Sequence, residues 1–191
     1  MSHQSIQYQA PCIQATVVCP VGTISVSASH LGITHLTMAS VAETPDEAIE
    51  TQLLDTLLLE NGSGEPHPTH LFHARIHLIK MIRQLQEYFA GTRLTFDVPL
   101  AAKGTEFQQQ VWQALTQMQY GEACCYSDIA EQINRPKAMR AVGAANGANP
   151  IAIVVPCHRV IGKNGKLTGY AHGLPMKSYL LSLESKYRVS Q

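Results

Sequence analysis

The chain has 191 residues, and its 14 basic and 14 acidic side chains give a formal net charge of zero. Apolar residues make up 45% of the chain and charged residues 15%, against about 25% in ordinary globular proteins, and this apolar content argues against intrinsic disorder. The sequence has no run of about 18 apolar residues and begins without a signal-peptide pattern, so we expect a cytoplasmic protein with no membrane partner.

The first third of the chain has the alternating apolar residues of short strands. Three strands joined by tight turns are predicted over residues 15–19, 23–29 and 33–39. A helix is predicted over residues 45–60, and the Gly- and Pro-rich stretch over residues 61–68 is predicted to be a loop.

A second helix is predicted from Thr69, its N-cap, to Phe89, with Gly91 as its stop. Its inward face is expected to consist of Phe72, Ile76, Ile79, Met81 or Ile82, Leu85 and Phe89. A histidine-rich stretch also falls here, made up of His67, His70, His73 and His77. These histidines either bind a metal ion or form a solvated polar face of the helix. The three helical histidines lack a fourth ligand, which favours the solvated face.

Residues 97–103 are predicted to be a linker, so we expect a structural domain over residues 1–100 and a second domain over residues 101–191. The second domain opens with a capping-box pattern from Thr105 to Gln108, which predicts a helix. That helix is expected to bury Phe107, Val111, Leu115 and Met118.

Short elements are predicted in the rest of the chain. A helix-turn-helix candidate is formed by two short helices over residues 127–133 and 137–146. Residues 151–155 are predicted to be a buried strand, and Asn164-Gly165 predicts a hairpin. Pro175 is expected to begin a last helix that ends near Lys186. Strands at one end and helices at the other indicate the α+β class.

The zero net charge conceals an asymmetry along the chain. Residues 1–134 hold 5 basic and 13 acidic residues, a balance of −8, whereas residues 135–191 hold 9 basic residues and only Glu184, a balance of +8. This polarisation indicates that the basic part faces a polyanion. The alternative is that loops distribute these charges over unrelated faces.

The five cysteines do not predict a disulfide framework or a zinc ribbon, because their number is odd and none has C-x-x-C spacing. Cys157 is distinctive because it follows small apolar residues and precedes His158 and Arg159. A neighbouring histidine or cation lowers a thiol pKa and so favours the nucleophilic thiolate. The alternative is a small buried core residue, and spacing alone favours that alternative.

Three further candidates have structural alternatives. Tyr126 precedes a predicted helix, where a core position is common. Arg140 is a lone cation among small residues, and it either pairs with an acid or points at something outside the protein. Glu184 lies at the basic end of the chain, where an ordinary surface ion pair with Lys177 or Arg188 is the alternative.

Segments in both halves of the chain resemble a known protein family. GTEFQQQVWQAL, RAVGAANGANP and PCHRVIGKNGKLTGYAHGLPMKSYLLSLE resemble the active domain of the O6-alkylguanine-DNA alkyltransferases, or methylated-DNA–protein-cysteine methyltransferases. CPVGTISVSASHLGITHL and QLQEYFAGTRLTFDVPL are similar to the N-terminal domain of their bacterial stand-alone form. The resemblance implies a ribonuclease H-like sheet with helices, followed by a mainly helical, winged-helix-like domain with the helix-turn-helix.

The resemblance implies a suicide DNA repair reaction that needs no cofactor. O6-alkylguanine, with O4-alkylthymine as a possible second substrate, is flipped out of duplex DNA, and its alkyl group moves irreversibly to Cys157. His158 takes the thiol proton through a water, and Glu184 orients the imidazole. Asn149 braces the site, and Tyr126 donates to the base. The residues implied to line the substrate pocket are Val160, Ala171, His172 and Lys177.

On the DNA side the resemblance implies binding in the minor groove. A monomer is the default expectation for the oligomeric state. Arg140 fills the space that the flipped base leaves, and the small residues around it let the helix approach the DNA closely. The other residues implied to contact DNA are Tyr126, Ser127, Arg135, Lys163 and Gln108.

Some positions depart from the family pattern. His172 stands where Gly or a large aromatic residue is common, so we expect it to narrow the pocket or to titrate near neutrality. Cys124 and Cys125 stand where the family usually has residues with hydroxyl groups. Either these cysteines only pack in the interior, or one of them is a second reactive thiol. Ser29 and Thr34 stand where some members carry zinc ligands, so we expect no structural zinc.

Two other functions stay open at this point. A non-catalytic protein that binds alkylated lesions would share the DNA-binding residues, but the presence of Cys157 disfavours it. A cysteine hydrolase that uses Cys157 and His158 would turn over repeatedly and would not need DNA.

Overall fold

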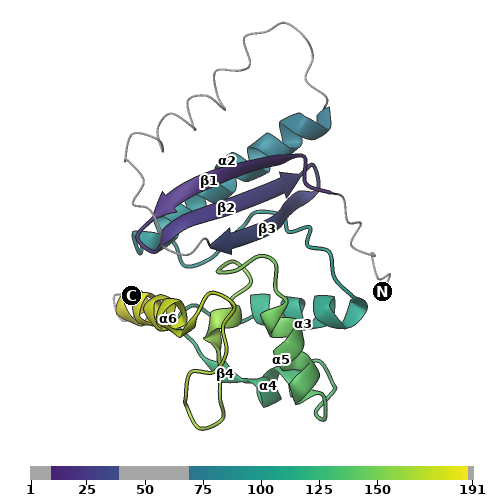
Figure 1. The fold of residues 1–191 in the computed structure, drawn as a ribbon, viewed down its shortest axis with the longest axis vertical. Coiled ribbons are helices and arrows are strands. Elements are labelled where there is room, and N and C mark those ends of the chain that lie inside the picture. The colour runs from purple at the N-terminus through teal and green to yellow at the C-terminus, as the bar shows by residue number, and fades with distance from the viewer. Residues whose placement is uncertain (1–9, 39–68, 189–191) are drawn as a thin grey trace, which may run out of the picture. The chain divides into compact units, whose positions relative to one another are not determined.

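The computed structural model describes residues 10–38 and 69–188 of the chain, which divides into two compact units, Met1–Lys103 and Gly104–Gln191 (Figure 1). The helix predicted over residues 45–60 and the loop predicted over residues 61–68 lie outside the described residues. Most strand residues lie in the first unit and most helices in the second, so the predicted α+β class is confirmed. No helix within the two described ranges is both long and apolar enough to cross a membrane.

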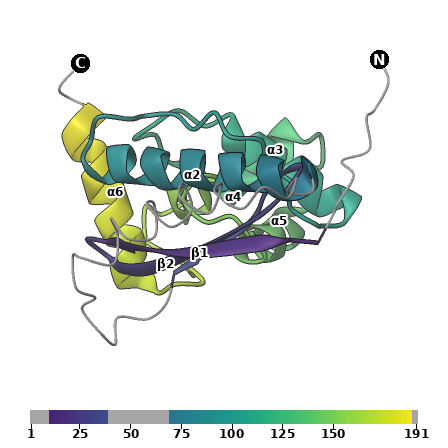
Figure 2. The same ribbon diagram turned by 90° about the horizontal axis from the view of Figure 1, so that it is seen from above.

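The first unit is an antiparallel sheet with a helix on one face. Its strands are β1 (Ile13–Cys19), β2 (Gly22–Ser29) and β3 (Gly32–Met38), paired in that order, which confirms the three predicted strands. Helix α2 (Thr69–Phe89) runs along the sheet, as Figure 2 shows from above. Alternate strand residues and one side of α2 bury the apolar core, which includes Val17, Ile24, Val26, Leu36, Leu78, Met81 and Leu85.

The buried side of α2 includes Met81, Ile82, Leu85 and Phe89, as predicted, but it differs from the prediction near the start of the helix. The inward positions predicted for Phe72 and Ile76 are wrong, because these side chains are 51% and 46% exposed. The buried stripe contains Gln84, whose side-chain oxygen accepts a hydrogen bond from Asp97 N at 3.1 Å. Gly91, at φ +75°, ends the helix as predicted.

The second unit is a set of short helices around two short parallel strands. Its elements in chain order are α3 (Glu106–Thr116), β4 (Cys124–Cys125), α4 (Tyr126–Gln132), α5 (Met139–Gly147), the 3-10 helix η2 (Cys157–Arg159), β5 (Val160–Ile161) and α6 (Leu174–Arg188). The predicted capping box is confirmed, since Thr105 N donates to Gln108 Oε1 at 2.8 Å and Gln108 N donates to Thr105 Oγ1 at 3.3 Å. Helices α4 and α5 form the predicted helix-turn-helix.

Residues 151–155 are buried as predicted, but they are not a strand. They form consecutive turns, in which Val154 N donates to Ala152 O at 2.8 Å and Val155 N donates to Ile151 O at 3.0 Å. Ile153 lies within both turns at φ +70°, a positive value that is rare for a β-branched residue. The β-branched composition predicts a strand, and the tertiary surroundings override that propensity.

The turn at Asn164-Gly165 forms, and Gly162 N donates to the Lys166 carbonyl across it at 3.0 Å, but the described residues on its two sides do not form a longer hairpin ladder. Gly165 lies at φ +75°, and its N–H donates to Gly162 O at 2.8 Å. The residues before the turn pair elsewhere: β5 runs parallel to β4, with Val160 opposite Cys124. This pairing joins the segment that follows Cys157 to the start of the helix-turn-helix.

Two buried polar contacts attach α5 to its neighbours. Trp112 Nε1 donates to the Ala145 carbonyl at 2.9 Å, which joins α3 to α5. Asn146 Nδ2 donates to the Cys157 carbonyl at 3.3 Å, which joins α5 to η2. Because both donors are buried, these bonds resist exchange with water and hold the helix-turn-helix against the segment that carries the cysteine.

Candidate functional site

Cys157 begins η2 and is 4% exposed, so its thiol lies just beneath the surface at the end of the buried turns. Asn149 Nδ2 donates to Cys157 Sγ at 3.0 Å and to the Val155 carbonyl at 2.8 Å. Asn149 Oδ1 accepts from Ile151 N at 3.0 Å. One amide therefore braces both the turns and the sulfur. The burial of Cys157 agrees with the alternative that it is a small core residue. The hydrogen bond from Asn149 to its sulfur instead favours a functional thiol.

The protonation state of Cys157 is set by its burial. Burial raises the pKa of the thiol above its ordinary value. The hydrogen bond from Asn149 and the positive charge of Lys177 lower the pKa but do not reverse the shift. The lowering of the thiol pKa that a neighbouring histidine or cation can cause is therefore outweighed by burial. At neutral pH the resting group is a protonated thiol, which needs a base before it can act as a nucleophile.

His158 is suited to act as this base. Its side chain is fully buried, and Nε2 lies 2.9 Å from Glu184 Oε1. Because an ionised carboxylate only accepts hydrogen bonds, Nε2 carries the hydrogen and Nδ1 keeps a lone pair. Burial lowers the pKa of His158 and outweighs the opposite effect of Glu184. Nδ1 is buried and has no hydrogen-bond partner within the described ranges, so this neutral imidazole can accept a proton.

Glu184, on α6, is fully buried and carries the negative charge of the site. Arg159 Nε donates to Glu184 Oε2 at 2.8 Å, Arg159 Nη2 donates to Oε1 at 2.9 Å, and Gly121 N donates to Oε2 at 3.1 Å. Burial alone would raise the pKa of Glu184, but the bonds from His158 and Arg159 outweigh it and lower the pKa to about 2. The surface ion pair considered from the sequence is therefore wrong.

Arg159 belongs to the site although the sequence predicts no role for it beyond that of a cation near the thiol. Its side chain is buried, its Nη1 donates to the Met118 carbonyl at 2.9 Å, and its guanidinium carbon lies 5.7 Å from the centre of the Tyr120 ring. Its position two residues after Cys157 is the sequence signal that could have indicated it. The direction of its side chain depends on contacts with α6, which the local sequence does not reveal.

The residues predicted to line a substrate pocket differ in how deeply they are buried. Lys177 is fully buried, and its Nζ donates to the carbonyls of Val160 at 2.6 Å and Thr168 at 2.8 Å. Burial lowers the pKa of Lys177. Ala171 is exposed, while His172 is half-buried with its ring in edge-to-face contact with Tyr170 at 5.4 Å. Lys177 thus holds the loop whose far end carries the other two residues.

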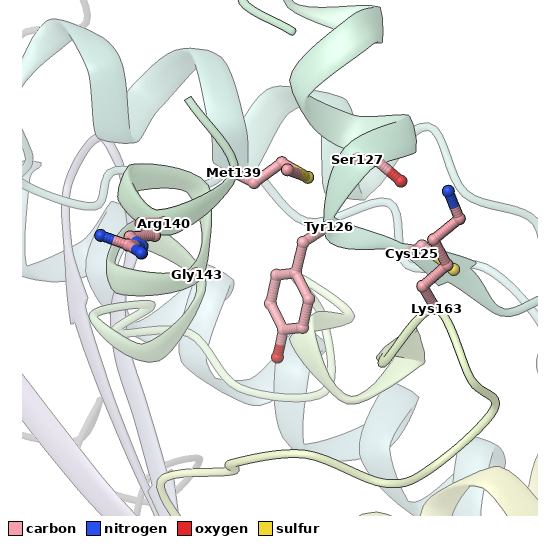
Figure 3. Close-up of a pocket in the computed structure, with 7 residues that line it drawn as sticks. All are labelled: Cys125, Tyr126, Ser127, Met139, Arg140, Gly143 and Lys163. Atoms are coloured by element: carbon pink, nitrogen blue, oxygen red, sulfur yellow. The ribbon is translucent and has the colours of Figure 1, made fainter. Parts of the chain in front are cut away.

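A hollow of about 280 Å³ lies on the helix-turn-helix (Figure 3). Its lining consists of Cys125, Tyr126, Ser127, Met139, Arg140, Gly143 and Lys163. Figure 3 shows the ring of Tyr126 between the helix that carries Arg140 and the strand end that carries Cys125. The Tyr126 hydroxyl lies 3.3 Å from Thr168 Oγ1. Four residues predicted to contact DNA therefore surround one hollow.

Two other residues predicted to contact DNA do not line this hollow. The Gln108 side chain is part of the capping box that begins α3. The guanidinium carbon of Arg135 lies 5.6 Å from the centre of the Phe107 ring, over its face. Arg135 is exposed and so keeps an open side toward a partner, whereas the oxygen of Gln108 is already bonded within the protein.

The first unit gathers histidines from two elements. The rings of His30 and His70 stack at 3.9 Å between centroids, and His77 Nε2 lies 3.3 Å from the His30 carbonyl. His67 falls outside the described residues. Within residues 10–38 and 69–188, no three His, Cys, Asp or Glu side chains are placed to hold a metal ion. Thr34 instead donates to the Ser27 carbonyl at 3.1 Å.

Two family models match the chain. The model of the 6-O-methylguanine DNA methyltransferase, ribonuclease-like domain, matches residues 13–102. The model of the 6-O-methylguanine DNA methyltransferase, DNA binding domain, matches residues 106–186. Together the two matches take in both compact units of the chain.

Individual relatives agree with these matches. The methylated-DNA–protein-cysteine methyltransferase of Methanosarcina acetivorans is 64% identical over 102 residues, which are 53% of this chain and 65% of that protein. The match thus spans just under two thirds of the relative's length. The solved O6-methylguanine methyltransferase of Mycobacterium tuberculosis has a TM-score of 0.69 at 40% identity, covering 91% of this chain and 93% of that chain. The M. tuberculosis OGT in complex with DNA has a TM-score of 0.69 at 41% identity, covering 90% of this chain and 92% of that chain.

The Glu184 network predicts a pH-dependent contribution to stability. Because the pKa of Glu184 is depressed in the folded protein, its contribution is fully present above the unfolded pKa of about 4.3 and is lost as the pH falls toward about 2. We expect Glu184→Gln to lower the free energy of unfolding by about 3 kcal/mol at neutral pH and by clearly less near pH 3. Urea unfolding at both pH values measures the difference.

Glu122→Gln provides the matched control for this measurement. Glu122 pairs with Arg188 at 3.3 Å on the surface, and both side chains are about half exposed. Its loss is expected to change the free energy of unfolding by less than about 1 kcal/mol at either pH. A Glu184→Gln deficit of the same size at both pH values would contradict the network described above.

Proposed function

Because the chain belongs to the 6-O-methylguanine DNA methyltransferase family, we propose that it repairs DNA by moving the alkyl group of O6-alkylguanine onto its own Cys157. The observation that carries this proposal is the set of contacts around one thiol: Asn149 braces the sulfur, and the adjacent His158 is held by Glu184. The activity is that of a methylated-DNA–protein-cysteine S-methyltransferase that acts once.

Burial of the thiol dictates how the substrate reaches it. The O6 position of a stacked guanine lies on the major-groove edge of a base that the duplex holds in place, and Cys157 is 4% exposed. A base that stays in the stack cannot approach such a sulfur, so the guanine is extruded from the helix at a cost of a few kcal/mol. Under this proposal the partner is duplex DNA, and the protein binds it through the minor groove, where sequence is read only weakly.

The transfer begins with removal of the thiol proton. His158 Nδ1 accepts this proton through a water, while the Nε2–H bond to Glu184 fixes the imidazole. The thiolate attacks the alkyl carbon, the S–C bond forms as the C–O bond breaks, and the bonding electrons remain on O6 of the guanine. Tyr126 donates to the base and so stabilises its developing charge. The product is a thioether that cannot return to a thiolate, so one protein repairs one lesion without a cofactor.

The hollow on the helix-turn-helix supports the DNA side of the proposal. Arg140 enters the stack and takes the place of the extruded base, and Gly143, on the same helix, faces the Tyr126 ring, which a β-carbon at that position would meet at 3.8 Å. Ser127 and Lys163 lie beside the same hollow and contact the sugar-phosphate backbone. Arg135 and Gln108 add outer contacts. The excess of basic residues after residue 134 adds sequence-independent attraction to DNA.

The mass of the intact protein tests the alkyl transfer directly. After incubation with a duplex oligonucleotide that carries one O6-methylguanine, we expect a gain equal to one CH2 group, localised to Cys157. The Cys157→Ala variant should show no gain, whereas Cys12→Ala, which removes an exposed thiol of the first unit, should react like the wild type. Tight binding without a mass change would support the non-catalytic lesion-binding function instead, and repeated turnover of a DNA-free ester would support a hydrolase.

Arg140→Ala tests the role of the helix-turn-helix. We expect the rate of transfer from duplex DNA to fall at least tenfold, about 1.4 kcal/mol, because nothing fills the space left by the base. Transfer from free O6-methylguanine should change little. Lys137→Ala removes a charge just before the same helix without touching the hollow, and its effect on the duplex reaction should be smaller. Equal losses with duplex and free base would mean that Arg140 is structural.

A further inference from the structure

The Glu184 carboxylate is shared between two donors of different charge. His158 contributes one hydrogen bond at 2.9 Å, and Arg159 contributes two, at 2.8 and 2.9 Å, to the two oxygens. This fork-to-fork geometry is the strongest that an arginine and a carboxylate make. The charge of Glu184 is therefore compensated by Arg159 before the imidazole gains any proton.

We propose that Arg159 is a positioning residue that keeps His158 neutral in the resting protein, so that the imidazole is ready to take the proton of Cys157. This inference rests on the proposed function. A buried carboxylate paired only with an imidazole draws a proton from solvent onto that imidazole, because the ion pair relieves the buried charge. With Arg159 in place, the same protonation leaves an excess positive charge in a buried site.

A proton that comes from Cys157 has a different effect on the charge of the site. Its transfer creates a thiolate together with the imidazolium, so the total charge of the site does not change. The arrangement therefore opposes protonation of His158 by solvent and permits protonation by the thiol. Arg159 thus selects where the proton comes from, although it touches neither the sulfur nor the substrate.

The groups around His158 support this assignment to Arg159. Cys157 precedes it on η2, and Glu184 and Lys177 act on it from α6, while Tyr120 and Tyr170 interact with Glu184 and not directly with the imidazole. Burial raises the pKa of Tyr120 to about 12 and also raises the pKa of Tyr170, so both tyrosines are neutral. Lys177 is a second cation, but its Nζ is bonded to the carbonyls of Val160 and Thr168.

The pH profile of alkyl transfer tests the proposal. We expect Arg159→Gln, which keeps a donor but loses the charge, to move the acidic limb of the single-turnover rate upward by about one pH unit or more. Arg159→Lys, which keeps the charge, should retain the wild-type limb even if its rate is lower. Arg188→Gln is the matched control, because Arg188 is exposed and bonds the Gly121 carbonyl, and its limb should not move.

Titration of the His158 imidazole by nuclear magnetic resonance provides a second measurement that needs no substrate. Its midpoint should lie below the ordinary histidine value in the wild type and should rise in Arg159→Gln. An unmoved limb together with an unmoved midpoint would overturn the inference about Arg159. If Arg159→Gln does not fold, Arg159→Lys decides, since an upward shift of its limb would also overturn it. Failure of the wild type to acquire an alkyl group would instead overturn the proposed function.

Discussion

A carboxylate that is removed from water needs a compensating positive charge and a full set of donors, and Glu184 meets this requirement with residues from three parts of the second unit. Arg159 and His158 come from η2, Gly121 comes from the turn before β4, and Glu184 itself comes from α6. Because each donor has one favourable position, the carboxylate fixes the imidazole, the guanidinium and the turn together. The last helix is therefore a structural component of the site although its sequence lies far from Cys157.

Burial, rather than the Glu184 network, determines the resting state of the thiol. Burial keeps Cys157 protonated, and the hydrogen bond from Asn149 directs the sulfur without ionising it. Under the proposed function this protects a group that reacts only once, since a thiol reacts far more slowly with oxidants and stray electrophiles than a thiolate. Reactivity then depends on a base, which the neutral imidazole of His158 supplies when substrate is present.

Much of the fold is encoded locally and can be predicted. The three strands of the first unit follow alternating apolar residues between tight turns, and the capping box of α3 depends on two residues three positions apart. The buried stripe of α2 is predictable only in part, because Gln84 is buried with a bond to Asp97, which lies in another segment. Residues 151–155 have the composition of a strand, but their turns depend on the Asn149 amide rather than on their own β-branched side chains.

The site is predictable to a similar extent. The adjacency of Cys157 and His158 is a property of the sequence, whereas Glu184 is indicated by the family resemblance and not by spacing. The contact of Arg159 with Glu184 and the burial of Lys177 require α6 to pack on η2, which no local pattern reveals. The direction of the Cys157 pKa shift is set by burial, which the sequence does not reveal because it shows neighbouring charges but not the loss of solvent.

Titration of the Cys157 thiol tests the central claim most directly. The ultraviolet absorbance of the thiolate is followed against pH in the unreacted wild type, and the titration of Cys157→Ser is subtracted to remove the other cysteines. A buried thiol that depends on His158 predicts a midpoint above the ordinary thiol value of about 8.5. A midpoint below neutral pH would show that Cys157 rests as a thiolate, and the assignment of His158 as its base would then be wrong.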